Sequence, residues 1–134
     1  MLGQIAYAMP FLAQGFAVTL WVSLLVVVLS LVAGVMMGVG LVYGPAPLRW
    51  AVRIFSDTIR GIPILVLIFF VYYGLPAVGI HLESFWAAVL ALTLFKTAQV
   101  IEYLRGAVGS IPKGQSEAAM AIGLTFRQRL AYVI

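Results

Sequence analysis

The chain of 134 residues contains no cysteine and a single histidine. It therefore forms no disulfide and no zinc–thiolate site, and one histidine cannot build a multi-histidine metal centre. Charge is scarce as well, because only 9% of the residues are charged, against about 25% in soluble domains. A soluble fold must cover its surface with polar groups, so this composition excludes an ordinary soluble domain and a disordered chain.

Apolar residues dominate instead, at 64% of the chain with a mean hydropathy of +1.14. A helix rises about 1.5 Å per residue, so roughly 20 residues cross the hydrocarbon core of a bilayer. We predict an all-α membrane protein with transmembrane helices at residues 17–42, 55–75 and 84–106. The second contains Pro63 near its start and the breaker Gly74-Leu75-Pro76 near its end, so we expect one helix from within residues 50–60 to about Tyr73.

The basic residues give an orientation, because lysine and arginine are enriched in cytoplasmic loops. They are absent before the first span and from the 77–83 loop. They are present in the 44–60 loop and after the third span, as Arg49, Arg53, Arg60, Arg105, Lys113, Arg127 and Arg129. We therefore predict an outside N-terminus and a cytoplasmic 107–125 loop in the inner membrane. The net charge of +4 lies beside apolar segments, which favours membrane lipid rather than nucleic acid as its partner.

The sequence predicts a short helix in the loop after the third span. Ser116 is a candidate N-cap, Glu117 suits the positive end of a helix dipole, and Gly123 is placed to end the helix. Thr125 and Gln128 then match a capping box that begins another helix, the start of a fourth span. We expect the first helix to expose a small face, formed by Ala118, Ala119, Ala121 and Ile122. This face suits either close contact with a protein partner or a position on the lipid headgroups.

Motifs in this order resemble importer-type ABC transporter permeases with an EAA motif, in their polar amino-acid uptake branch. Glu117-Ala118-Ala119 followed by Gly123 resembles the EAA signature. Arg60-Gly61-Ile62-Pro63, the run from Phe69 to Pro76, the stretch from Glu102 to Gln115, and Gln14-Gly15 to Ser23 resemble other parts of the same branch. The resemblance covers roughly residues 10–134.

This resemblance implies the N-terminal part of a five-helix permease that pairs with a second permease copy or paralogue. It implies a cytoplasmic ABC ATPase subunit and an extracytoplasmic solute-binding protein as partners. The ATPase-coupling residues would be Gly114, Glu117, Ala118, Ala119, Ile122 and Gly123. The sequence lacks a G-x-x-x-x-G-K-[ST] phosphate loop, so ATP hydrolysis is expected on a separate chain and this subunit is not an enzyme.

The family pattern continues beyond residues 131–134 into Leu-Pro and two more spans, so we expect residues 1–134 to be a partial, C-terminally truncated permease domain. No catalytic constellation and no cofactor is predicted. The sequence does not name the amino acid carried. The alternative function is a small multi-span membrane scaffold or channel without an ATPase partner.

Ionisable and polar groups at depth in a span normally face protein or water. Lys96, Gln99 and Glu102 in the third span are candidates for the substrate path. Lys96 and Gln99 can share a face, whereas Glu102 is offset from Lys96 and can pair with Arg105. We expect Arg60 to reach lipid headgroups, and Gly34-x-x-x-Gly38 to allow close helix packing.

Overall fold

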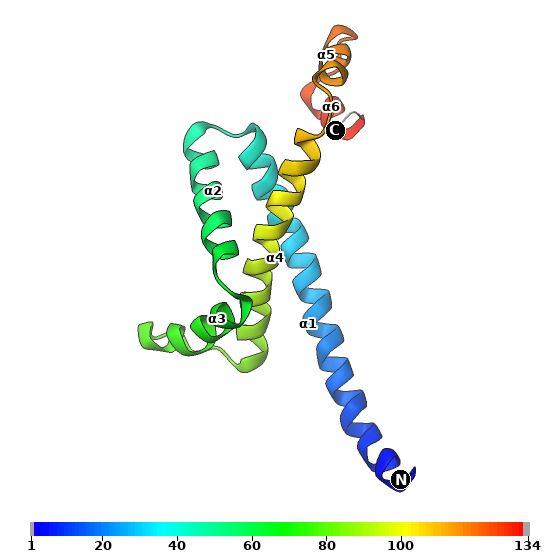
Figure 1. The fold of residues 1–134 in the computed structure, drawn as a ribbon, viewed down its shortest axis with the longest axis vertical. Coiled ribbons are helices and arrows are strands. Elements are labelled where there is room, and N and C mark those ends of the chain that lie inside the picture. Colours follow the sequence, from blue (N-terminus) through cyan, green and yellow to red (C-terminus); the bar gives the residue numbers. More distant parts are fainter. Residues whose placement is uncertain (1, 133–134) are drawn as a thin grey trace.

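The computed structural model describes residues 2–132, with side chains from residue 8 onward except those of Lys113 and Leu130. These residues form helices and no strand: α1 (Leu2–Tyr43), α2 (Ala46–Gly61), α3 (Ile64–Phe69), a π-helical turn η1 (Phe70–Gly74), a 3-10 turn η2 (Leu75–Val78), α4 (Ser84–Gly109), α5 (Lys113–Ala121) and α6 (Phe126–Tyr132) (Figure 1). Two of them, α1 over Ala8–Tyr43 and α4, are long and apolar enough to cross a membrane. The predicted all-α membrane fold is confirmed.

Helix α1 ends at Tyr43, close to the predicted end at residue 42, but it begins at Leu2 rather than near residue 17. Pro10 lies inside it and does not end it. A proline removes one backbone hydrogen bond and costs about 3 kcal/mol in a helix interior. The uninterrupted helical segments on both sides of Pro10 outweigh that cost.

The second predicted span is not one straight helix. The helical segments 46–61 and 64–78 meet at an angle of 105°, so they form either a bent span or a re-entrant segment. The break follows from Pro63, which caps the start of α3 and forces the preceding Ile62 into an extended conformation (φ −94°, ψ 127°). The proline was expected inside a continuous helix, and it divides the helix instead.

The breaker Gly74-Leu75-Pro76 acts later than predicted. The chain stays helical through η1 and η2 to Val78, with Pro76 in the first turn of η2. The helical segment ends before Gly79, whose φ of +86° is a left-handed conformation that glycine adopts without strain.

Helices α1 and α4 pack tightly because two glycines of α1 face α4. A Cβ on Gly34 would lie 2.5 Å from the Cβ of Val100, and one on Gly38 would lie 3.3 Å from the Cβ of Leu104. Both distances are shorter than ordinary contact, so only glycine permits this approach at Gly34. The packing prediction for Gly34-x-x-x-Gly38 is confirmed.

Helix α2 packs on another side of α4. Val52 of α2, Leu41 of α1 and Ile101 of α4 form one buried cluster. Ser56 is fully buried, and its Oγ donates a hydrogen bond of 3.3 Å to the carbonyl oxygen of Ala98. Leu67 of α3 joins α4 in a second buried cluster nearer the Ser84 end. Helix α4 is therefore the central element against which α1, α2 and α3 pack.

Candidate functional site: the short helix α5 and a polar groove

The short helix α5 stands beyond the ends of α1 and α4 (Figure 1). It begins after Pro112 rather than at Ser116, so the predicted cap residue lies inside the helix. It ends at Ala121, and Gly123 two residues later adopts the predicted left-handed conformation, with a φ of +78°. The backbone N–H of Leu124 donates to the Ala119 carbonyl over 3.0 Å, which satisfies a carbonyl at the helix end.

The capping box after α5 is also confirmed. The Thr125 N–H donates to Gln128 Oε1 over 2.9 Å, and the Gln128 N–H donates to Thr125 Oγ1 over 3.4 Å. The α6 helix that follows is tied to the end of α1 by an edge-on ring contact between Phe126 and Tyr43, with centroids 5.1 Å apart. The α5–α6 segment is thus defined by local contacts and attached to the first span.

The predicted small face of α5 is divided. Ala119 is buried, whereas Ala118, Ala121 and Ile122 are exposed. Ala119 lines a shallow groove of about 400 Å³ between α5 and α6, with Gln115, Ala118, Ile122, Leu124 and Tyr132. The predicted exposure of Ala119 was wrong, because α6 folds back beside it.

The remaining predicted coupling residues lie on the surface. Ile122 is 77% exposed, and Gly114, Glu117 and Gly123 are exposed too. A Cβ added to Gly114 would meet no atom within 4 Å. A large apolar side chain held this openly on a short, well-capped helix is a candidate contact for a partner protein.

A groove of about 490 Å³ runs between α1 and α4 and contains Lys96 and Gln99. Lys96 Nζ donates a hydrogen bond of 3.1 Å to Gln99 Oε1, so the two share a face as predicted. Within the described residues Lys96 forms no ion pair. Among the described residues its ammonium group therefore has the Gln99 amide oxygen as its polar partner, and it faces the open groove.

Three further polar residues line this groove, and the sequence reasoning did not assign them to the path: Ser23 and Ser30 of α1 and Tyr103 of α4. Their spacing in the sequence could have indicated that they share a helix face. Ser23 and Ser30 are seven residues apart, and Tyr103 follows Gln99 by four, so each pair repeats on one helix face. The apolar part of the lining is mostly valine and leucine, typical of small-molecule sites.

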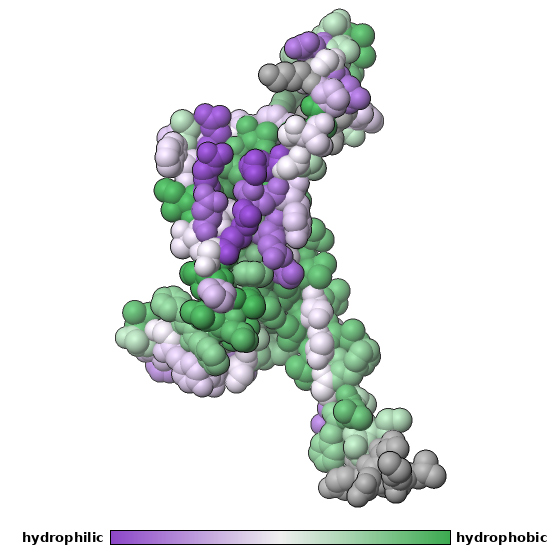
Figure 2. Space-filling view, viewed as in Figure 1, coloured by the Kyte–Doolittle hydropathy of each residue, from purple (hydrophilic) through white to green (hydrophobic). Residues whose placement is uncertain are grey.

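Glu102 does not join this groove. Its Oε2 accepts hydrogen bonds from Arg105 Nη2 at 2.8 Å and Nε at 3.0 Å, and lies 3.4 Å from Arg60 Nη1. Arg60 thus pairs with a carboxylate of another helix, where we had expected it to reach lipid headgroups. Figure 2 shows hydrophilic side chains gathered along α2 and the adjacent part of α4. Among the described residues no cluster of His, Cys, Asp or Glu is suited to a metal ion.

Comparison with known proteins gives a consistent picture. Residues 30–134 match the model of the binding-protein-dependent transport system inner membrane component family. The chain is 40% identical over 127 residues to the probable glutamine ABC transporter permease protein GlnP of Bacillus subtilis (strain 168), covering 94% of this chain and 58% of that protein. It is 34% identical over 118 residues to the arginine transport system permease protein ArtQ of the same organism, covering 87% and 54%.

A similar relation holds for the glutamine transport system permease protein GlnP of Escherichia coli (strain K12), at 36% identity over 129 residues, covering 95% of this chain and 59% of that protein. Among solved structures, the chain matches the crystal structure of an amino acid ABC transporter with histidines, with a TM-score of 0.87 and 28% identity over 98% of this chain and 61% of that one. The chain spans a little over half the length of these permeases. It is a multi-pass membrane protein that belongs to the family of binding-protein-dependent transport system inner membrane components, and the relatives named above are amino-acid ABC permeases.

Proposed function

We propose that this chain is the membrane subunit of an ATP-driven importer for polar amino acids, and that α5 docks onto a separate cytoplasmic ABC ATPase subunit. The observation that carries the proposal is the form of α5. It is a short helix beyond the ends of the long helices, bounded by Pro112 and Gly123, with Ile122 exposed. A passive scaffold or channel has no need of such an element.

The attachment of this segment suits force transmission. Tyr43 at the end of α1 contacts Phe126 of α6, and the turn at Ser110 joins α5 to α4. A movement of α5 is therefore passed to both helices that line the polar groove. Closure of an ATPase dimer would move this docking segment as a rigid body and change which side the groove faces.

Orientation and partners complete the proposal. The basic residues of α2 and of the α5–α6 segment support a cytoplasmic position for those elements and an outside position for the turn around His81. A second permease, identical or paralogous, would complete the path, and an extracytoplasmic solute-binding protein would deliver the substrate.

For the path itself we propose Lys96 and Gln99 as substrate contacts. A lysine at depth in a span needs an anionic partner or water. An amino acid carries an α-carboxylate, and an acidic amino acid carries a second. Lys96 would favour acidic or neutral polar substrates over cationic ones, because like charges at contact distance repel strongly in a low dielectric. We do not propose Glu102 as a substrate contact, because its carboxylate pairs with Arg60 and Arg105.

The cysteine-free background allows a direct test of docking and orientation together. Ile122→Cys should cross-link to an importer-type ABC ATPase of the same host and should react with an impermeant thiol reagent only after permeabilisation. His81→Cys is the matched control on the opposite loop, and it should react in intact cells and form no such cross-link. Outside labelling of Ile122→Cys, or a cross-link that forms equally from His81→Cys, would contradict the proposal and favour a scaffold or channel.

A further inference from the structure

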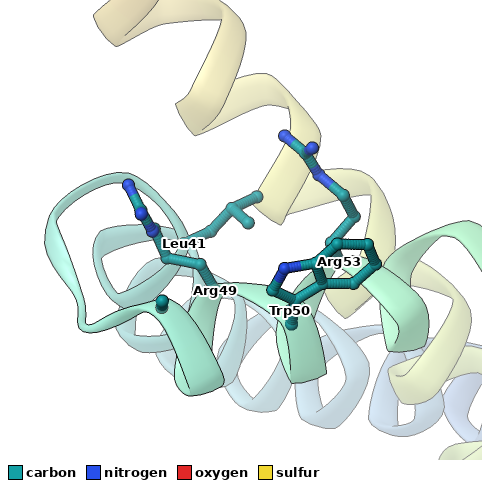
Figure 3. Close-up of a pocket in the computed structure, with 5 residues that line it drawn as sticks. Leu41, Arg49, Trp50 and Arg53 are labelled. Carbon is teal, nitrogen blue, oxygen red and sulfur yellow. The ribbon is translucent and has the colours of Figure 1, made fainter.

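Another concave site lies where α1 ends and α2 begins (Figure 3). Its volume is about 340 Å³, and it is lined by Leu41, Ala46, Arg49, Trp50 and Arg53. It is separate from the groove that holds Lys96. Its lining combines two cations with apolar side chains, which is the composition that an amphiphilic anion requires.

The two arginines of this site are not held in close ion pairs, although Arg53 lies near enough to Glu102 for their charges to attract each other. Arg49 and Arg53 are one helical turn apart and exposed, and neither forms an ion pair or hydrogen bond within the described part of the chain. Figure 3 shows both guanidinium groups extending to the same side of α2, with Leu41 between them. Paired guanidinium groups bind the oxygens of a phosphate with good geometry.

The apolar side of the site indicates where such a phosphate comes from. Trp50 is 67% exposed, and Ile54, on the same face one turn further along, is 58% exposed. Tryptophan side chains concentrate at the interface between hydrocarbon and water. A soluble phosphate gains nothing from exposed Trp50 and Ile54, whereas a phospholipid places acyl chains beside them.

We propose that Arg49, Trp50 and Arg53 form a binding site for the phosphate group of an anionic phospholipid such as phosphatidylglycerol. Basic pockets beside membrane helices recognise such headgroups. In the proposed orientation the lipid belongs to the cytoplasmic leaflet, and it fixes the turn between α1 and α2 at the membrane surface. The binding chemistry itself does not depend on that orientation.

The test is native mass spectrometry of the purified chain released from nanodiscs of mixed phosphatidylcholine and phosphatidylglycerol. The parent should retain phosphatidylglycerol in preference to phosphatidylcholine. Arg49→Gln and Arg53→Gln should each lower its retention roughly fivefold, and the double variant more, since each basic residue near a membrane surface contributes about that factor. Arg127→Gln, an exposed arginine of α6 outside this site, should leave retention unchanged.

Two additional arms make the outcome decisive. Circular dichroism checks that each variant keeps the parental helix content. The double variant Arg49→Lys, Arg53→Lys should retain an intermediate amount of lipid, because lysine keeps the charge and loses the guanidinium geometry. Inorganic phosphate at millimolar concentration should not displace the lipid. Displacement would assign the site to a soluble phosphate and overturn the proposal, as would equal retention by the parent and a folded double variant.

Discussion

Helix α4 presents two polar faces that differ in how their charges are compensated. On one face Glu102 is held by Arg105 at 2.8 Å and by Arg60 at 3.4 Å. On the other, Lys96 donates a hydrogen bond to the Gln99 amide, forms no ion pair within the described residues, and faces a groove of about 490 Å³. The Glu102 carboxylate is fully paired, and its contact with Arg60 joins α2 to α4, so this face stabilises the fold. Lys96 has no counter-ion beside an open groove, so its charge is available to bind a ligand.

Separating α1 from α4 should lower the stability of the fold the most. Gly34→Leu would place a side chain against Val100, where even a Cβ lies 2.5 Å away, and would separate α1 from α4. We expect the free energy of unfolding in mixed micelles to fall by about 3 kcal/mol, measured by tryptophan fluorescence. Gly15→Leu is the control, because a Cβ there meets nothing within 4 Å. Equal stability of the two variants would contradict the packing account.

Removing the carboxylate of the Glu102 face should lower the free energy of unfolding by an intermediate amount. Glu102→Gln leaves Arg60 and Arg105 facing each other without their carboxylate. Because Arg60 and Arg105 are partly exposed, we expect a loss of about 1–3 kcal/mol in the same unfolding measurement. Asp57→Asn removes an exposed carboxylate of α2 that forms no ion pair within the described residues, and it should change stability much less. A Glu102 variant as stable as the Asp57 variant would show that the paired face is not structural.

Changing only the groove face should leave stability nearly unaltered and alter transport instead. Lys96→Met removes an exposed charge, so we expect a stability change within about 0.5 kcal/mol. In vesicles with the complete transporter it should raise the KM for an acidic amino acid about 10- to 100-fold, the value of a charged hydrogen bond. Competition by glutamate, glutamine and arginine gives the readout. Preferred inhibition of the parent by arginine would mean that Lys96 faces away from the path.

What the sequence predicted correctly was chemistry that acts within a few residues. Gly123 ends α5 and Thr125 pairs with Gln128 because a left-handed glycine and a capping box work through adjacent backbone groups. The contact of Lys96 with Gln99 is local in the same sense.

What the sequence did not reveal depends on contacts between helices. Arg60 meets Glu102 because α2 packs on α4, and the buried Ala119 lies in a groove that it shares with Tyr132 of α6. Pro63 is an intermediate case. Its chemistry is local, but the long apolar run that follows it predicted a single span and concealed the 105° bend between the two helical segments.

The central claim, that α5 couples ATP hydrolysis to movement of the spans, is tested most directly by the ratio of ATP hydrolysed to amino acid imported. Gly123→Asp forces a side chain into a left-handed position and Glu117→Lys reverses an exposed charge on α5, and neither residue lies in a long helix. In proteoliposomes with the ATPase and binding protein, both variants should insert normally while uptake falls at least tenfold relative to hydrolysis. The parental ratio in both variants, with normal ATPase association, would contradict the account.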